Sequence, residues 1–356
     1  MGVILCDMRT LYWENNALQM IDQRKLPNSL EIVSLHSHLE VVDAIKDMIV
    51  RGAPAIGAAG AFGIALAAQQ IPTRSIVTFK KSLTKAGDLI ISSRPTAVNL
   101  AWAVTRIINK VQATNESIDV LKSIALSEAQ LIADEDIRSN KKMGQYGAEL
   151  IQAGDSIIHH CNTGSLAVVE WGTALGVIRT AYEQGKNIHV LVDETRPRLQ
   201  GARLTAWELK EYGIPFHVIS DNMAGYFLQT RQATKVLFGA DRIAANGDVV
   251  NKIGSYMLAL AAFDNSVPVY VVAPFSSVDF SSNDGFQVDI EERDPEEVLG
   301  LQFKGEQVFP KGTRAKNPAF DITPNRLITA IVTEKGIVYP PFQKNLQAIR
   351  SAPSIC

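Results

Sequence analysis

The chain has 356 residues, 46% of them hydrophobic, and its 35 basic and 37 acidic side chains give a formal net charge of −2. A chain of this length has room for two domains, each with its own core. The charges are balanced and no block of Lys or Arg stands out, which excludes the basic surface typical of proteins that bind nucleic acid or anionic membranes. Any anionic partner is therefore expected to be small.

The cysteines and the N-terminus indicate where the protein works. Cys6, Cys161 and Cys356 are odd in number and far apart, which argues against a disulfide framework and indicates a reducing, cytoplasmic compartment. The first residues lack a basic stretch followed by an apolar core, so no signal peptide is predicted. Residues 52–68 are uncharged but rich in Ala and Gly, and this low hydrophobicity favours a helix buried within the protein over a membrane span.

The N-terminal part of the chain is predicted to be mainly helical. Short strand-like runs open it, at residues 10–13 and 30–34. Ser37 and Glu40 have the spacing of a capping box, and the apolar residues after them predict a helix that ends near Arg51. Because proline is common in the first turn of a helix, Pro54 and Pro95 predict two further helix starts. The helices expected after Arg51 are 55–70, 97–111 and 118–153.

The C-terminal part alternates short apolar runs with segments of helix length. The expected strands are 157–161, 188–192, 216–219, 235–238 and 267–272. This alternation predicts a parallel, doubly wound sheet. We therefore expect an α/β protein, with a small, mostly helical domain with short strands at 1–153 and a Rossmann-like α/β domain at 154–356 that carries the chemistry.

Polar residues directly follow four of the predicted strands. They are Cys161, the pair 193–194, the run 220–222 and Asp241. Carboxyl ends of parallel strands meet at one edge of the sheet, where open α/β sheets bind ligands. A thiol and a carboxylate at that edge are suited to proton transfer on a small molecule.

Cys161 ends an expected strand just before an expected helix. A free cysteine is commonly a buried, unreactive thiol, and this alternative stands beside the catalytic one. A helix N-terminus would lower the pKa of the thiol and a dry pocket would raise it, so the sequence leaves the direction open. His159 and Cys161 share a face of the strand, but no motif supplies further ligands, so no metal is predicted.

Two arginines each precede a predicted helix start. Arg51 stands before Gly52 and Ala53, and Arg94 stands before Pro95. Backbone N–H groups at a helix start bind phosphate, and a neighbouring arginine neutralises its charge. The alternative is a solvated arginine at an ordinary helix break. No Walker motif or Gly-x-Gly-x-x-Gly fingerprint is present, so no nucleotide cofactor is predicted.

Asp241, Asn251 and Lys252 also have two interpretations. Asp241 could cap a helix or pair with Arg242, and the other two could start a capped surface helix. Placed after the strand that ends at Phe238, all three would instead face the same crevice as Cys161. These residues alone thus predict a phosphorylated small molecule and proton transfer.

Taken together, these motifs resemble the methylthioribose-1-phosphate isomerase family of methionine salvage, over nearly the whole chain. The wider superfamily also contains regulatory subunits of a translation-initiation guanine-exchange factor and ribose-1,5-bisphosphate isomerases. Gln200, the run 291–295 and the NPAFD segment favour the methylthioribose branch. The matching motifs are DQRKLP at 22–27, RGAPAIG at 51–57, SRPTAVNL at 93–100, CNTG at 161–164, ETRP at 194–197, LQG at 199–201, LTAWEL at 204–209, GADRI at 239–243, NKIG at 251–254 and NPAFD at 317–321.

The resemblance implies an aldose–ketose isomerase that converts 5-methylthioribose 1-phosphate to 5-methylthioribulose 1-phosphate. It implies Asp241 as the acid and Cys161 as its catalytic partner. The implied substrate contacts are Arg51, Gly52, Ala53, Arg94, Gln200, Asn251 and Lys252. A homodimer is also implied, while no cofactor, metal, nucleic acid or membrane is expected.

Several questions stay open at the level of sequence. We expect burial to raise the pKa of Asp241 so that it holds a proton near neutrality. Cys161 could act as a base that forms an enolate-like intermediate, or lie in an apolar pocket that favours a hydride shift. The substrate could instead be 5-deoxyribose 1-phosphate or a related sugar 1-phosphate. A non-catalytic assembly subunit of the initiation-factor kind would not need Cys161 near Asp241.

Overall fold

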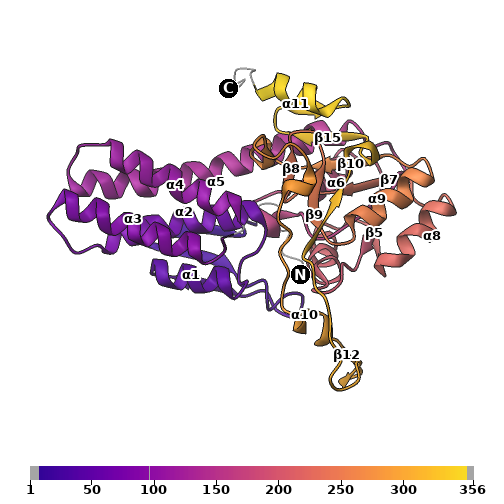
Figure 1. The fold of residues 1–356 in the computed structure, drawn as a ribbon, viewed down its shortest axis with the longest axis horizontal. Helices are drawn as coiled ribbons and strands as arrows, with labels where there is room; N and C mark the ends of the chain where they lie inside the picture. Colours follow the sequence, from indigo (N-terminus) through magenta and orange to yellow (C-terminus); the bar gives the residue numbers. More distant parts are fainter. Residues whose placement is uncertain (1–7, 96, 351–356) are drawn as a thin grey trace. The chain divides into compact units, whose positions relative to one another are not determined.

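A computed structural model describes residues 8–95 and 97–350 of the chain. Cys6, Thr96 and Cys356 lie outside the described residues. The described chain forms two compact units, shown in Figure 1. Of the described residues, the helical unit contains 8–141 together with Thr163–Gly172, and the sheet unit contains Lys142–Asn162 and 173–350. The division into domains at residues 153 and 154 stays a prediction.

Helices dominate the helical unit. They are α1 (His38–Lys46), α2 (Ala53–Gln70), α3 (Ile76–Ser92), α4 (Val98–Ala113) and α5 (Ile118–Ala148), whose last turns belong to the sheet unit. The antiparallel strands β1 (Leu11–Glu14), β2 (Ala17–Ile21) and β3 (Ile32–Leu35) pair in that order. The capping box of α1 is confirmed. The expected helix over 118–153 is five residues too long, because the backbone after Tyr146 closes tighter turns.

Helix α2 is the buried centre of the helical unit. Every residue from Ala55 to Ala68 is buried, which confirms a helix enclosed by protein neighbours. Its glycines let α4 approach closely: a Cβ placed on Gly57 would lie 3.0 Å from the carbonyl oxygen of Asn99. Along residues 8–95 and 97–350, no helix combines the length and the apolar character needed to cross a membrane.

The sheet unit is built on a seven-stranded sheet with the order β16-β15-β10-β7-β4-β5-β6. All neighbouring strands are parallel except β15 and β16. The strands are β4 (Ser156–His159), β5 (His189–Asp193), β6 (Phe216–Ile219), β7 (Lys235–Phe238), β10 (Val269–Val272), β15 (Ala330–Thr333) and β16 (Gly336–Val338). The five predicted strands are confirmed, whereas β15 and β16 were not predicted.

Helices cover both faces of this sheet. Successive strand residues point to opposite faces, so Ile157 joins one hydrophobic cluster and Ile158 the other. The first cluster includes residues of α6 (Ala174–Glu183), α7 (Ala206–Glu211) and the end of α5, and the second includes residues of α8 (Ala224–Gln229), α9 (Ser255–Asp264) and α11 (Phe342–Arg350). The expected doubly wound α/β architecture is thereby confirmed.

A smaller sheet begins in the chain after β7. Its order is β11 (Val278–Asp279), β8 (Arg242–Ala244), β9 (Val249–Lys252) and β14 (Phe320–Thr323). A short helix α10 (Glu296–Leu299) and the hairpin of β12 (Gln302–Phe303) and β13 (Glu306–Gln307) follow along the chain. Asn251 and Lys252 therefore end a buried strand, and the alternative that they start a surface helix is wrong.

The helix expected directly after Cys161 is also wrong. The segment that follows makes only a short 3-10 turn at Ser165–Ala167, and α6 begins at Ala174. The reason is that residues 163–172 leave the sheet unit, close on themselves through a bridge between Gly164 and Gly172, and pack in the helical unit.

Candidate active site

The main sheet reverses its strand order between β4 and β7. From β4 the chain continues to β5 and β6 on one side, whereas β7 lies on the other side and is followed outward by β10 and β15. Open α/β sheets bind ligands at such a switch point, outside the carboxyl ends of the strands. Cys161 follows β4 and Asp241 follows β7. Because His159 pairs with Leu237 and neighbouring strands lie about 5 Å apart, both residues emerge at this point.

Two threonines hold the backbone of Cys161. The cysteine is buried and has a φ of 67°, in the left-handed region that side chains with a Cβ rarely adopt. Its N–H donates to Thr195 Oγ1 at 2.9 Å, and its carbonyl oxygen accepts from Thr205 Oγ1 at 2.8 Å. Strained backbone of this kind persists only where its surroundings enforce it, and it clusters at functional sites.

Thr195 is itself held by the next strand end. Its N–H and that of Arg196 donate to the two carboxylate oxygens of Asp221, at 2.7 and 2.8 Å. Thr195 Oγ1 also donates to the carbonyl oxygen of Asp193 at 3.1 Å. The loops after β5 and β6 thus support the position of Cys161.

Asp241 lies beside the strand that carries Asn251 and Lys252. Its N–H donates to the carbonyl oxygen of Val250 at 3.0 Å, just before the β8–β9 hairpin. The residue is only partly buried, in contrast to the burial expected from sequence. The hairpin therefore brings the backbone of these three predicted site residues together.

Lys252 is a buried cation at the end of β9. Its Nζ donates to the carbonyl oxygen of Ala319 at 2.8 Å and lies 4.4 Å from the centre of the Phe320 ring. Asn251 Nδ2 donates to Ser255 Oγ at 2.8 Å. An ammonium group at the strand ends could contribute to binding an anion, and this role stays a prediction.

Gln200 carries a buried acceptor that the described part of the chain does not satisfy. Its side chain is buried, and Oε1 has no hydrogen-bond partner among the residues that the structure describes. The residue precedes a π-helical turn at Gly201–Thr205, a form often found at functional sites. Buried polar atoms are nearly always satisfied, so Oε1 points to a ligand that donates a hydrogen bond, such as a sugar hydroxyl.

The predicted anion contacts of the helical unit lie at two helix starts. Gly52 is the N-cap of α2, which begins at Ala53, and Arg94 precedes α4. Gly57, one turn into α2, packs against Asn99 in the first turn of α4. The two helices therefore begin side by side, and their N-terminal N–H groups form a positive end.

Gly52 also packs tightly on the segment 163–172. It has a φ of 93°, and a Cβ placed on it would lie 2.2 Å from the carbonyl oxygen of Ala167. Only glycine fits both the conformation and the contact. The segment is further held by hydrogen bonds from Thr10 Oγ1 to the Ser165 carbonyl and from Gln23 Nε2 to the Leu166 carbonyl.

Gly52→Ala is expected to lower the free energy of unfolding by about 3 kcal/mol, because it adds backbone strain and a collision with Ala167. Gly154→Ala is the matched control, since Gly154 has a φ of 83° but a Cβ placed on it would meet nothing within 4 Å. The control should cost about 1 kcal/mol. Urea unfolding of both variants checks this, and equal losses would show that the contact with Ala167 is unimportant.

Asp136 on α5 forms a pH-dependent hydrogen bond with the segment 163–172. Its Oδ2 accepts hydrogen bonds from the N–H of Val169 at 2.8 Å and from Asn140 Nδ2 at 3.0 Å. Burial raises the pKa of Asp136 from 3.8 to about 7, against the lowering effect of these bonds. Since the folded pKa exceeds the unfolded one, the associated stability is full below about pH 4 and is lost as the pH rises through about 7.

Asp136→Asn, which mimics the neutral acid, is therefore expected to be more stable than the wild type at pH 8, by on the order of 1 kcal/mol. At pH 4 the two proteins should be alike. Asp134→Asn, at a half-exposed position earlier in the same turn of α5, is the control. Denaturant unfolding at both pH values measures the effect, and an unchanged pH dependence in Asp136→Asn would contradict it.

The structure joins two residues, His160 and Asp193, that had no predicted role. His160 Nδ1 lies 2.8 Å from Asp193 Oδ2, and both side chains are 1% exposed. Burial lowers the pKa of His160, but the hydrogen bond and charge of Asp193 outweigh it and the net shift is upward. Burial raises the pKa of Asp193 to about 6. Their positions at neighbouring strand ends were the only signal in the sequence.

These two residues and Asp221 form a group whose potential metal-binding atoms lie within 4.8 Å of one another. Both nitrogens of the His160 ring are engaged, so the ring is a poor metal ligand here, whereas Asp193 Oδ1 has no hydrogen-bond partner among the residues that the structure describes. The His160 ring bonds to Asp193 and to the Ile253 carbonyl, and both oxygens of Asp221 accept backbone N–H groups.

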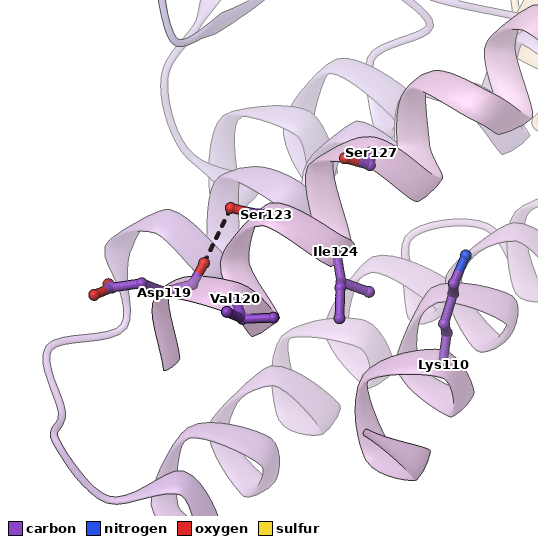
Figure 2. Close-up of a pocket in the computed structure, with 6 residues that line it drawn as sticks. All are labelled: Lys110, Asp119, Val120, Ser123, Ile124 and Ser127. Carbon is purple, nitrogen blue, oxygen red and sulfur yellow. Dashed lines mark hydrogen bonds between the residues drawn. The ribbon is translucent and has the colours of Figure 1, made fainter. Parts of the chain in front are cut away.

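A separate pocket of about 360 Å³ lies in the helical unit, between α4 and α5 (Figure 2). It is lined by Lys110, Asp119, Val120, Ser123, Ile124 and Ser127. Ser123 Oγ donates to the Asp119 carbonyl at 3.1 Å, and Lys110 pairs with Glu128. None of the predicted site residues lines this pocket, so it is distinct from the strand-end site.

The sequence profile of the Initiation factor 2 subunit family matches residues 49–340, and the chain belongs to this family. It is 51% identical to a methylthioribose-1-phosphate isomerase of Acetivibrio thermocellus, over 96% of this chain and 100% of that protein. It is 50% identical to the protein of the same name from Thermotoga maritima, over 96% and 98%. These similarities place the chain in the methylthioribose-1-phosphate isomerase branch of the family, which confirms the resemblance seen in its motifs.

The solved structures similar to the chain include two that cover nearly all of it. One is described as 5-methylthioribose 1-phosphate isomerase from Pyrococcus horikoshii OT3 and has a TM-score of 0.90 at 43% identity, covering 96% of this chain and 95% of that one. The other is described as translation initiation factor eIF-2B, subunit delta, from A. fulgidus. It has a TM-score of 0.86 at 45% identity and covers 96% and 99%.

Proposed function

We propose that the protein is an aldose–ketose isomerase that converts 5-methylthio-α-D-ribose 1-phosphate to 5-methylthio-D-ribulose 1-phosphate in methionine salvage. The observation that carries this proposal is the emergence of Cys161 and Asp241 on either side of the switch point of the sheet. The names of the relatives support the same reaction.

The phosphate on O1 prevents the sugar from opening spontaneously to an aldehyde, so the enzyme has to open the ring. Asp241 donates its proton to the ring oxygen, the C1–O4 bond breaks, and O4 becomes the hydroxyl of C4. Positive charge then lies on C1 and its phosphate oxygen. Bound substrate would cover the partly exposed Asp241.

Hydrogen then moves from C2 to C1, and the 2-hydroxyl loses its proton to the carboxylate of Asp241 as C2 becomes the ketone. In one route Cys161 removes the C2 proton and C1 is protonated afterwards. In the other, hydride passes directly from C2 to C1 in an apolar pocket around the buried Cys161. Both routes balance, and both regenerate the acid.

The remaining site residues hold the substrate. We assign phosphate binding to Arg51, Gly52, Ala53, Arg94 and the Asn251–Lys252 pair, because a held phosphate does not leave C1. Gln200 accepts from a sugar hydroxyl through its unsatisfied Oε1.

Proton NMR of the purified protein with 5-methylthioribose 1-phosphate in D₂O tests the proposal, with 5-deoxyribose 1-phosphate alongside. Ketose formation from the first sugar is expected. Deuterium at C1 would favour the enolate route, and its absence the hydride shift. A preference for 5-deoxyribose 1-phosphate would mean that this sugar is the substrate instead. No turnover of either sugar would favour the assembly-subunit alternative suggested by the A. fulgidus relative.

Arg94→Ala is expected to raise KM about 10- to 100-fold while kcat changes less than about threefold, because hydrogen bonds to a charged group contribute about 1.5–3 kcal/mol of binding. Arg74→Ala, at an exposed position of the same unit, is the control and should match the wild type. Initial-rate kinetics give both constants. A fall in kcat with unchanged KM would mean that Arg94 acts in the transition state instead.

We further propose that the protein is a cytoplasmic homodimer. The resemblance implies the dimer, and exposed apolar side chains on α8 and α9 support it: Tyr226, Met257 and Phe263 are 58%, 69% and 57% exposed. Light scattering of the wild type and of Met257→Lys tests the oligomeric state. We expect a dimer for the wild type and a monomer for the variant. A monomeric wild type would contradict it.

A further inference from the structure

The His160 ring links two strand ends of the sheet unit. It precedes Cys161, and its Nε2 atom lies 3.0 Å from the carbonyl oxygen of Ile253, the residue after Lys252. On its other side, Nδ1 meets the carboxylate of Asp193 at 2.8 Å. The ring is thus enclosed between two acceptors, one from the end of β5 and one from the segment after β9.

The two acceptors determine where the protons lie. A carbonyl oxygen can only accept, so Nε2 has to carry a hydrogen. The proton between Nδ1 and Asp193 is then shared by the ring and the carboxylate. The surrounding carboxylates of Asp193, Asp221 and Asp321 favour the cationic ring, and Lys252 is a positive charge that interacts with Asp321.

The backbone around Ile253 is built to receive this ring. Gly254 has a φ of 105°, and a Cβ placed on it would lie 2.8 Å from Cε1 of His160. The N–H groups of Gly254 and Tyr256 donate to Asp321 at 2.7 and 3.2 Å, which fixes the start of α9. The ring therefore packs against a segment that cannot easily shift.

We propose that His160 is a positioning residue for the isomerase reaction, which ties the strand end that carries Cys161 to the segment that carries Lys252. The Nε2–H bond to Ile253 fixes the lysine, and the Nδ1 bond to Asp193 fixes the ring. The consequence is that the thiol and the ammonium group keep a constant spacing. This inference rests on the proposed function for its kinetic consequences, but the link itself is independent of activity.

Two amide substitutions test the two hydrogen bonds of the His160 ring separately. In His160→Gln the amide nitrogen reaches the place of Nε2 and keeps a donor for Ile253, while in His160→Asn it reaches the place of Nδ1 and keeps only the bond to Asp193. We expect His160→Asn to lower kcat/KM about 100-fold, through a higher KM as well as a lower kcat, since a small misplacement of reacting groups has an effect of this size. The kcat/KM of His160→Gln should be at least tenfold higher than that of His160→Asn.

His217→Gln is the matched control, because His217 is an exposed histidine on β6 and the variant should have wild-type kinetics. Thermal unfolding of each variant accompanies the kinetics. Equal losses in His160→Asn and His160→Gln, or wild-type kinetics in the folded Asn variant, would overturn the proposal.

Nitrogen-15 NMR of the histidine rings in the wild type tests the link without using activity or a variant. At neutral pH we expect Nε2 of His160 to be protonated. An unprotonated Nε2 would overturn the inference even if the protein is an active isomerase. A protonated Nε2 in a protein that turns over neither sugar would leave the link in place and reject the proposed function instead.

Discussion

Asp241→Asn is expected to lower kcat about 10³-fold, because an amide of the same shape cannot protonate the ring oxygen. The backbone should hardly change, since Asp241 is anchored through its own N–H to Val250 rather than through its carboxylate. KM is therefore expected to stay within a few-fold of the wild type. Single-turnover NMR or a coupled ketose assay measures the loss.

Asp279→Asn is the control for this variant. Asp279 lies on β11, pairs with Arg242 at 3.4 Å and belongs to the same small sheet. If removing a carboxylate merely disturbed this sheet, both variants would lose activity alike. A near-wild-type rate for Asp241→Asn would remove it as the acid.

Replacing Cys161 is expected to have the second largest effect and to separate the two routes of hydrogen transfer. If the thiol is the base, Cys161→Ser and Cys161→Ala should both lower kcat about 10²- to 10³-fold. If the thiol instead contributes an apolar surface for hydride shift, Ala should retain more activity than Ser, because the hydroxyl adds polarity to the pocket. In either case KM should change little.

The backbone bonds from Thr195 and Thr205 make this comparison informative, because they hold residue 161 whatever its side chain is. Thr195→Ser, which keeps the acceptor for the Cys161 N–H, is the control and should be close to the wild type. Wild-type rates in both Cys161 variants would mean that the thiol takes no part in either route.

Five of the seven strands of the main sheet could be predicted from sequence. Strands β6 and β7 were predicted at their observed bounds, because short β-branched runs bounded by polar residues have few other conformations. The same pattern placed Cys161 and Asp241 after strands. The helix expected after Cys161 was wrong, since packing of residues 163–172 in another unit overrides local propensity.

The candidate site depended more on contacts between distant segments. His160 and Asp193 are 33 residues apart in sequence, and only the pairing of β4 with β5 brings them together. Asn251 and Lys252 could equally have started a helix until the partners of β9 were known. The burial of Asp241 was overestimated as well, because it depends on contacts with distant segments.

The sequence by itself determined the family, the α/β class and the residue types offered at the strand ends, because these follow from local patterns and ordered motifs. Only the tertiary structure decided the order of the strands, and with it the switch point between β4 and β7. It also decided the contact of Gly52 with Ala167 and the two acceptors around His160. The physical reason is that strand order, close backbone contacts and proton positions arise from packing between residues far apart in the chain.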